Sequence, residues 1–260
     1  MHRITENAIE DFAIKLLEHL GYSYIYAPSI APFPSSGGVV EDRGGSSSSG
    51  GVPAGRGGSF PSGEGAPENR GGQDMRHSYE EILLTGRLAE AVRRINPTVP
   101  TEAQEEAIKE IQRLNSPELL TNNESFHRLL TEGIKVSYQK DGQQRGDLVW
   151  LIDFNTPENN DFIVANQFTV VEDGVNKRPD VVLFVNGIPL VVIELKNAAD
   201  ENATIKSAFR QIETYKATIP SLFTYNAFTI ISDGLEARAG TISVVSRIVC
   251  LELQKVFNKS

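Results

Sequence analysis

The stretch that decides the fold runs from residue 178 to residue 196 and reads RPDVVLFVNGIPLVVIELK. Two β-branched, apolar runs flank Asn186-Gly187, and this dipeptide strongly favours a tight turn between antiparallel strands. Neither run alternates between polar and apolar side chains, which is typical of central strands that are covered on both faces. The stretch therefore predicts a buried hairpin whose open end carries Asp180, Glu194 and Lys196.

The charged side chains at the open end of this hairpin point to a specific chemistry. An ionised carboxylate beside a buried strand is costly unless an opposite charge or hydrogen bonds compensate it. Two carboxylates offer hard oxygen ligands to a divalent cation, and a lysine beside them suits a phosphodiester substrate. Asp180, Glu194 and Lys196 therefore indicate a metal-dependent nuclease.

The register of the hairpin decides whether the two carboxylates share a face. A two-residue turn pairs Asp180 with Ile193 and leaves Glu194 on the opposite face of the sheet. A three-residue loop, with Gly187 in the left-handed conformation and a bulge beside it, pairs Asp180 with Glu194 instead. The lysine two residues further along then lies on the same face, because side chains alternate along a strand. The chemistry therefore predicts the three-residue, bulged hairpin.

Pro179-Asp180 and Glu194-Leu195-Lys196 together resemble the signature of PD-(D/E)xK nucleases. The surrounding sequence is similar to one branch of these nucleases, the restriction subunits (R, or HsdR-type) of type I restriction-modification enzymes. The similarity covers nearly the whole chain apart from residues 35 to 72, and it rests most clearly on the segments LIDF at 151–154, PENNDF at 157–162, NQFTV at 166–170 and ISDG at 231–234.

The resemblance implies an α/β fold in which helices flank a mixed central β-sheet, the restriction-endonuclease-like core. It also implies a Mg²⁺-dependent endonuclease domain, with Mn²⁺ as a substitute, that hydrolyses DNA phosphodiester bonds. Asp180, Glu194 and the main-chain carbonyl of Leu195 are the expected metal ligands. Lys196 is expected to orient or deprotonate the attacking water, or to stabilise the developing charge. The choice among these lysine roles, and between one metal ion and two, stays open at the level of the sequence.

Three further side chains are candidates for this site. Gln211 and Tyr215 resemble the Gln-x-x-x-Tyr motif that accompanies the nuclease signature in type I restriction subunits and RecB-like nucleases. Their four-residue spacing places both on one face of a helix, where they support the catalytic loop or contact DNA. Glu10 is a weaker candidate, because an acid of the first helix often completes such sites. An acid near a helix N-terminus also favours the helix electrostatically, and Glu10 is then simply solvated.

Domain organisation follows from length and composition. A chain of 260 residues with 40% apolar side chains is expected to form a single endonuclease domain over residues 1–260. Residues 35–72 hold more than half of the 22 glycines, so this insertion is expected to be a flexible surface loop. The chain has no Gly-x-x-x-x-Gly-Lys-Ser/Thr motif. ATP binding and translocation are therefore expected only of downstream motor domains in a full-length subunit.

Partners and compartment follow from charge and cysteine content. The single cysteine, Cys250, excludes an internal disulfide and fits the cytoplasm, and no apolar run predicts a membrane span or signal peptide. The net charge of −9 is unusual for an autonomous binder of double-stranded DNA, because such proteins use lysine and arginine to neutralise phosphates. Either the metal supplies positive charge or a partner holds the DNA. The resemblance implies methyltransferase and specificity subunits as these partners.

Hydrophobic periodicity predicts the secondary structure around the hairpin. Helices are predicted at residues 5–20, 79–95, 102–114, 126–130 and 203–217. A capping box of Thr101 and Gln104 is expected to begin the third of these. Strands that join the hairpin in one mixed sheet are predicted at residues 134–139, 147–154, 162–171, 227–232 and 241–245.

Two other functions are compatible with the same residues. One is an independent PD-(D/E)xK nuclease of DNA repair, and helicase motifs encoded directly downstream would argue against it. The other is a noncatalytic DNA-binding or assembly module that keeps the fold, and Mg²⁺-dependent plasmid cleavage would exclude it.

Overall fold

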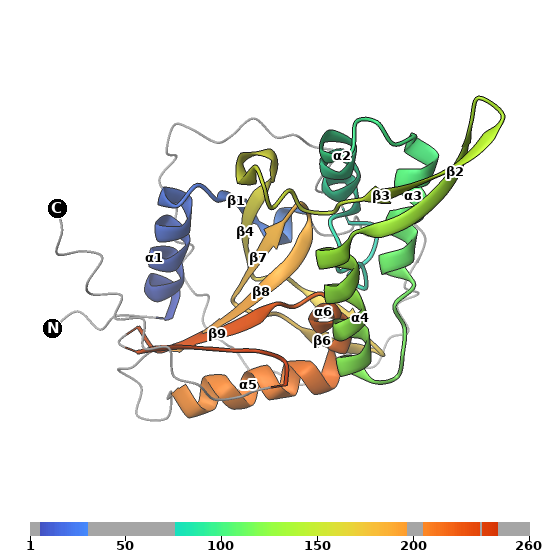
Figure 1. Cartoon of the computed structure of the whole chain (residues 1–260). Coiled ribbons are helices and arrows are strands. Elements are labelled where there is room, and N and C mark those ends of the chain that lie inside the picture. Colours follow the sequence, from blue (N-terminus) through green and yellow to red (C-terminus); the bar gives the residue numbers. More distant parts are fainter. Residues whose placement is uncertain (1–5, 31–75, 197–204, 235, 244–260) are drawn as a thin grey trace, which may run out of the picture.

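The computed structural model describes residues 6–30, 76–196, 205–234 and 236–243 (Figure 1). The glycine-rich insertion predicted at residues 35–72 lies outside these ranges, as do the last two residues of the strand predicted at 241–245. Within the described ranges, no helix has the length and apolar character needed to span a lipid bilayer.

A six-stranded mixed sheet forms the centre of the described fold. Strand β1 is parallel to β4 and β8 is parallel to β9, whereas the other neighbouring strands are antiparallel. The predicted α/β fold with a mixed central sheet flanked by helices is therefore confirmed. In spatial order the strands are β1 (Ser23–Tyr26), β4 (Phe162–Asn166), β7 (Val181–Val185), β8 (Ile188–Leu195), β9 (Phe228–Ser232) and β10 (Ala237–Gly240).

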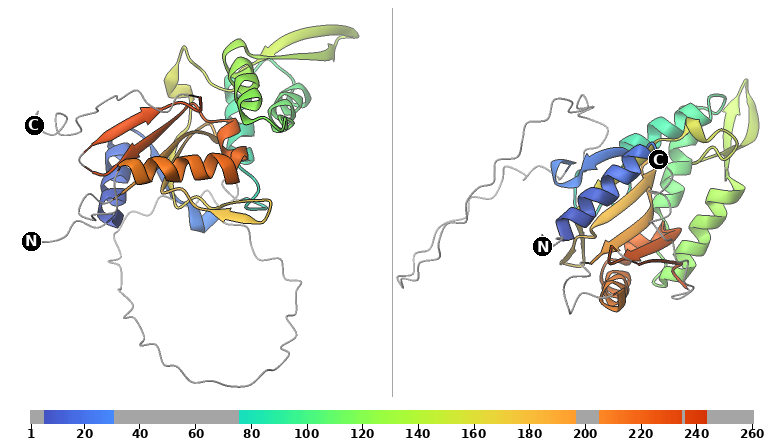
Figure 2. Two further views of the ribbon diagram at one scale, coloured as in Figure 1. Left: turned by 90° about the horizontal axis from the view of Figure 1, so that it is seen from below. Right: turned by 90° about the vertical axis from the view of Figure 1, so that its left-hand side faces the viewer.

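Helices cover both faces of the sheet (Figures 1 and 2). On one face Ile14 of α1 packs in a cluster with Val181, and on the other face Ile212 of α5 packs with Val182. The hairpin of β7 and β8 is thus buried on both faces, as its continuous apolar runs predicted. The helices are α1 (Glu6–His19), η1 (Ala27–Ile30), α2 (Thr85–Ile95), α3 (Thr101–Gln112), α4 (Leu119–Glu132), η2 (Pro157–Asn159), α5 (Ile205–Thr218) and α6 (Pro220–Thr224).

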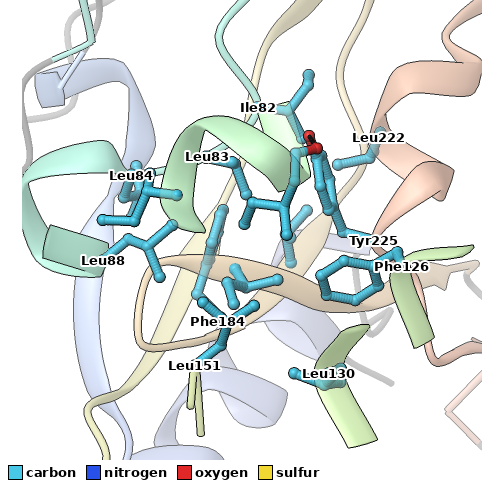
Figure 3. Close-up of a cluster of buried hydrophobic side chains, with 14 of the residues drawn as sticks. Ile82, Leu83, Leu84, Leu88, Phe126, Leu130, Leu151, Phe184, Leu222 and Tyr225 are labelled. Carbon is cyan, nitrogen blue, oxygen red and sulfur yellow. Dashed lines mark hydrogen bonds between the residues drawn. The ribbon is translucent and has the colours of Figure 1, made fainter. Parts of the chain in front are cut away.

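The larger hydrophobic core lies on the α5 face of the sheet. Figure 3 shows side chains from α2, α4, α6 and β7 in this core, among them Leu88, Phe126, Leu222 and Phe184. All four are fully buried, so the closed end of the hairpin is packed against helices far away in sequence. This packing leaves the open end, with its charged residues, at the opposite end of the two strands.

Two predicted strands do not join the central sheet. Strands β2 (Ile134–Lys140) and β3 (Gln143–Val149) pair only with each other and form a ribbon that projects from the fold (Figure 1). The prediction that they belong to the central sheet was wrong, because the outer half of the ribbon carries polar side chains that gain nothing from burial.

The strand predicted at residues 162–171 is also divided. Strand β4 ends at Asn166, and Gln167 has a φ of 55°, which turns the chain out of the sheet. The remainder forms β5 (Val170–Glu172), which pairs with β6 (Val175–Lys177) in a separate small hairpin.

Three helix predictions need correction. The helix predicted at 79–95 begins only at Thr85. The buried guanidinium of Arg76 donates to the main-chain oxygens of Tyr79, Glu81 and Thr169, and these hydrogen bonds keep residues 79–84 out of the helix. The short helix predicted at 126–130 is part of the longer α4. The capping box is absent, since Gln104 donates instead to the main-chain oxygens of two residues before the helix.

The strand predicted at residues 241–245 lies earlier in the chain, at Ala237–Gly240. Residues 241–243 are not in a strand, and β10 ends at Gly240.

Candidate active site

The turn of the central hairpin has two residues rather than the predicted three. Asn186 and Gly187 have φ values of 53° and 80°, and Val185 lies opposite Ile188. The pairing of Val185 with Pro189, which a three-residue loop requires, does not occur. The prediction of a three-residue loop was therefore wrong.

Tertiary contacts explain the tight turn. The side chain of Asn186 is fully buried, and its Nδ2 donates to the main-chain oxygen of Leu151 and to Oδ1 of Asn160. A Cβ atom at position 187 would lie 2.5 Å from the main-chain oxygen of Leu84, so only glycine fits there.

A bulge within β8 shifts the register by one residue, as is needed to place Asp180 opposite Glu194. Phe184 lies opposite Pro189, but Leu183 lies opposite Val191, so Leu190 is an extra residue on β8. The main-chain oxygen of Leu190 instead accepts hydrogen bonds from the main-chain N–H of Ala227 and from the side chain of Asn226.

The shifted register brings the two predicted carboxylates together. The last ladder pair is Val181 and Ile193, so the next residues in each strand, Asp180 and Glu194, face each other. The predicted juxtaposition is therefore present, although the bulge lies in the strand rather than at the turn.

Hydrogen bonds hold the three predicted residues in one cluster. Asp180 accepts a hydrogen bond of 2.8 Å at Oδ2 from the main-chain N–H of Leu195. Lys196 donates from Nζ to Oε1 of Glu194 at 2.7 Å and to the main-chain oxygen of Leu195 at 3.0 Å. The ammonium group thus lies between a carboxylate and a carbonyl oxygen that were both predicted as metal ligands.

Helix α5 contacts this cluster on the face of the sheet that it covers. The buried hydroxyl of Tyr215 donates to Oε2 of Glu194 at 3.2 Å. Gln211 lies one helical turn away and hydrogen bonds to Tyr215 with its side chain. These contacts fit the supporting role considered for the Gln-x-x-x-Tyr segment.

The charges in the cluster shift its protonation equilibria. Glu194 is only 2% exposed, and burial together with the negative charge of Asp180 raises its pKa from 4.5 to about 7. Hydrogen bonding and the positive charge of Lys196 act in the opposite direction. Burial, followed by the charge of Glu194, also raises the pKa of Tyr215. A cation placed between the carboxylates would relieve the cost of ionising them.

Glu10 occupies a different position from the one that either interpretation of the sequence suggested. It is 8% exposed and therefore not solvated. Its Oε1 accepts from Asn166 at 2.7 Å and its Oε2 from Gln167 at 2.8 Å, on the face of the sheet that α1 covers. Among the described residues, no three histidine, cysteine, aspartate or glutamate side chains form a group that could hold a metal ion. The structure therefore does not add Glu10 to the pair of Asp180 and Glu194.

Reasoning from the sequence assigned no role to the two amides that bind Glu10. Asn166 and Gln167 are consecutive polar residues at the end of a strand whose preceding residues are buried. That change from apolar to amide side chains is the available signal, because buried amides need hydrogen-bond partners.

The donor set of the cluster fits a hard divalent cation. Two carboxylates and one main-chain carbonyl supply only oxygen ligands, which Mg²⁺ and Mn²⁺ accept with water in the remaining positions. The position of the Lys196 ammonium group, 2.7 Å from Glu194 and 3.0 Å from the Leu195 carbonyl, shows that these oxygens already converge on a positive charge.

A mixed α/β sheet that presents an aspartate and a Glu-x-Lys at the open end of its central hairpin defines a restriction-endonuclease-like class of fold. The chain belongs to the family described as "Type I restriction enzyme R protein N terminus", whose sequence model matches residues 60–244.

Similar proteins come from both bacteria and archaea. The HindI type I endonuclease subunit of Haemophilus influenzae is 40% identical over 173 residues, which are 66% of this chain and 16% of that protein. The putative MjaIXP endonuclease subunit of Methanocaldococcus jannaschii is 29% identical over 236 residues, which are 90% of this chain and 19% of that protein. The chain therefore spans less than a fifth of the length of these relatives.

Proposed function

We propose that this chain is the Mg²⁺-dependent endonuclease domain of a type I restriction enzyme R protein and hydrolyses phosphodiester bonds in double-stranded DNA. Family membership and the names of the relatives, which are endonuclease subunits, support this function. The observation that carries it is the bulged register, which sets Asp180 opposite Glu194 with the ammonium of Lys196 2.7 Å from Glu194.

Each residue of the cluster has a distinct task in the proposed reaction. Asp180, Glu194 and the carbonyl of Leu195 would hold the cation. When bound, Mg²⁺ supplies positive charge to the phosphate and lowers the pKa of water beside it. Lys196 keeps its proton at Nζ, where its charge stabilises the negative charge that develops on the phosphate. Tyr215 keeps Glu194 oriented through its hydroxyl, and Gln211 in turn orients Tyr215.

Other parts of a type I enzyme would supply the positive charge that binds DNA and the motifs that bind ATP. The net charge of −9 disfavours strong independent binding to DNA. The proposed arrangement is therefore a complex in the cytoplasm in which specificity and methyltransferase subunits hold the DNA. ATP-driven translocation would belong to motor domains of the full-length subunit.

Cleavage of supercoiled plasmid tests the proposal. The R protein that contains this chain, assembled with its methyltransferase and specificity subunits and ATP, should cleave unmodified plasmid with Mg²⁺ or Mn²⁺. Ca²⁺ should support binding better than cleavage because its coordination is looser. Glu194→Gln should abolish cleavage but leave ATP hydrolysis intact, and Glu110→Gln on the exposed face of α3 is the matched control. Full cleavage by Glu194→Gln would overturn the proposed function.

A further inference from the structure

A network of polar groups lies on the α1 face of the sheet, opposite the face that carries Glu194. At its centre is the buried carboxylate of Glu10, with each oxygen accepting one amide N–H, from Asn166 and from Gln167. Asn166 is itself held by the hydroxyl of Tyr24, which donates to its Oδ1 at 3.0 Å. A carboxylate that is 8% exposed is costly to bury without partners, and the two amides supply a hydrogen bond to each of its oxygens.

The backbone of Gln167 connects this network to Asp180. The main-chain N–H of Gln167 donates to the main-chain oxygen of Asp180 at 2.9 Å. Asp180 is thus fixed at its backbone by the residue that follows β4 and at its carboxylate from β8, where the N–H of Leu195 binds it. Movement of Gln167 would therefore displace a proposed metal ligand.

The conformation of Gln167 depends on this network. Its φ is 55°, in the left-handed region that most residues avoid. Among the described residues, the other non-glycine residues with positive φ are Asp141, Asp173 and Asn186, and short aspartate and asparagine side chains tolerate this region. Gln167 has no such short side chain, and two hydrogen bonds hold it there: its main-chain N–H donates to Asp180 and its side-chain amide donates to Glu10.

We infer that Glu10 and Gln167 are positioning residues for Asp180, with Glu10 acting through Gln167 rather than as a metal ligand. This inference rests on the proposed function, since it concerns the geometry of the same metal site. Both carboxylate oxygens of Glu10 are already bound to amides on the opposite face of the sheet. Loss of a partner that orients a metal ligand typically weakens metal affinity by about 10- to 100-fold.

Calorimetry with Mn²⁺ on the full chain tests the inference. Gln167→Gly keeps the N–H that binds Asp180 and tolerates positive φ, but it removes the amide that binds Glu10. It should weaken Mn²⁺ binding about tenfold. The matched control is Asp141→Gly, which replaces another left-handed residue, at the exposed tip of the ribbon, and should leave the affinity unchanged.

An exchange of the two side chains separates positioning from metal binding. Gln167→Glu alone places a second carboxylate against Glu10, with no donor between them, and should weaken Mn²⁺ binding. Combining it with Glu10→Gln restores one donor and one acceptor in reverse order, and should return the affinity to within about threefold of wild type. Circular dichroism on each variant checks that it folds.

Each result has a definite meaning. Wild-type affinity in Gln167→Gly, or no recovery in the exchange variant, would overturn the positioning role while leaving the proposed function intact. A wild-type chain that binds no Mn²⁺ would instead overturn the metal site of the proposed function, and the positioning role with it.

Discussion

Replacing Glu194 by glutamine should change how the stability of the metal-free chain depends on pH. The pKa of Glu194 is raised from 4.5 to about 7 in the folded state, by burial first and by the charge of Asp180 second. Between these two pH values the folded chain retains a proton that the unfolded chain releases. The folded state therefore loses stability as pH rises through this window. At higher pH the full free-energy cost of ionising Glu194 in the folded state remains.

The size of the effect follows from the shift. One pKa unit corresponds to about 1.4 kcal/mol, so the penalty at pH 8 is about 3 kcal/mol. Glutamine has nearly the same shape as a protonated glutamate and carries no charge at any pH. The advantage of Glu194→Gln over wild type in the free energy of unfolding should thus grow by about 3 kcal/mol between pH 4 and pH 8.

Urea denaturation across this pH range, with a chelator present, measures the difference directly. Comparing variant with wild type cancels the contributions of titrating groups that do not interact with Glu194. Glu110→Gln, on the exposed face of α3, should give a curve parallel to that of wild type. Parallel curves for Glu194→Gln and wild type would refute the reasoning, because Glu194 would then have the same pKa in both states.

Three other predictions concern the same hairpin. Alanine at Asp180, Glu194 or Lys196 should abolish cleavage by the assembled enzyme while circular dichroism shows a folded chain, and wild-type cleavage by all three variants would contradict the assignment. Gly187→Ala should lower the free energy of unfolding by at least about 2 kcal/mol in urea denaturation, because the added Cβ would lie 2.5 Å from the main-chain oxygen of Leu84 at a φ of +80°. A melting curve identical to wild type would show that the turn can relax. Mn²⁺ should bind more tightly, with release of protons, as pH rises through the pKa of Glu194; calorimetric heats that are the same in buffers of different ionisation enthalpy would contradict that linkage.

The central features of the candidate site could be predicted because their signals are local. Asn186-Gly187 between two continuous apolar runs specified a buried hairpin, and alternation along β8 placed Glu194 and Lys196 on one face. The hypothesis that the two carboxylates bind one metal ion requires them to share a face, and it therefore predicted a register shift of one residue. That shift is present in the structure.

The location of the shift could not be predicted from the same residues. The bulge at Leu190 depends on hydrogen bonds from Asn226 and Ala227, which are far away in sequence. The two-residue turn likewise depends on the burial of Asn186 against Leu151 and Asn160. Turn propensity describes a hairpin in isolation. In this fold, buried backbone groups outside the hairpin require hydrogen-bond partners, and forming those hydrogen bonds favours the two-residue turn over the three-residue loop.

By itself, then, the sequence determined the α/β class, the buried hairpin and the identity of the charged cluster, because these follow from periodicity and from the chemistry of adjacent residues. Only the tertiary structure decided that the β2–β3 ribbon leaves the central sheet and that Gln167 turns the chain at the end of β4. It alone also placed Glu10 with two amides on the face away from Glu194. For Glu10 the physical reason is that its hydrogen bonds join residues more than a hundred positions apart, and no local pattern records which partner a buried polar group will find.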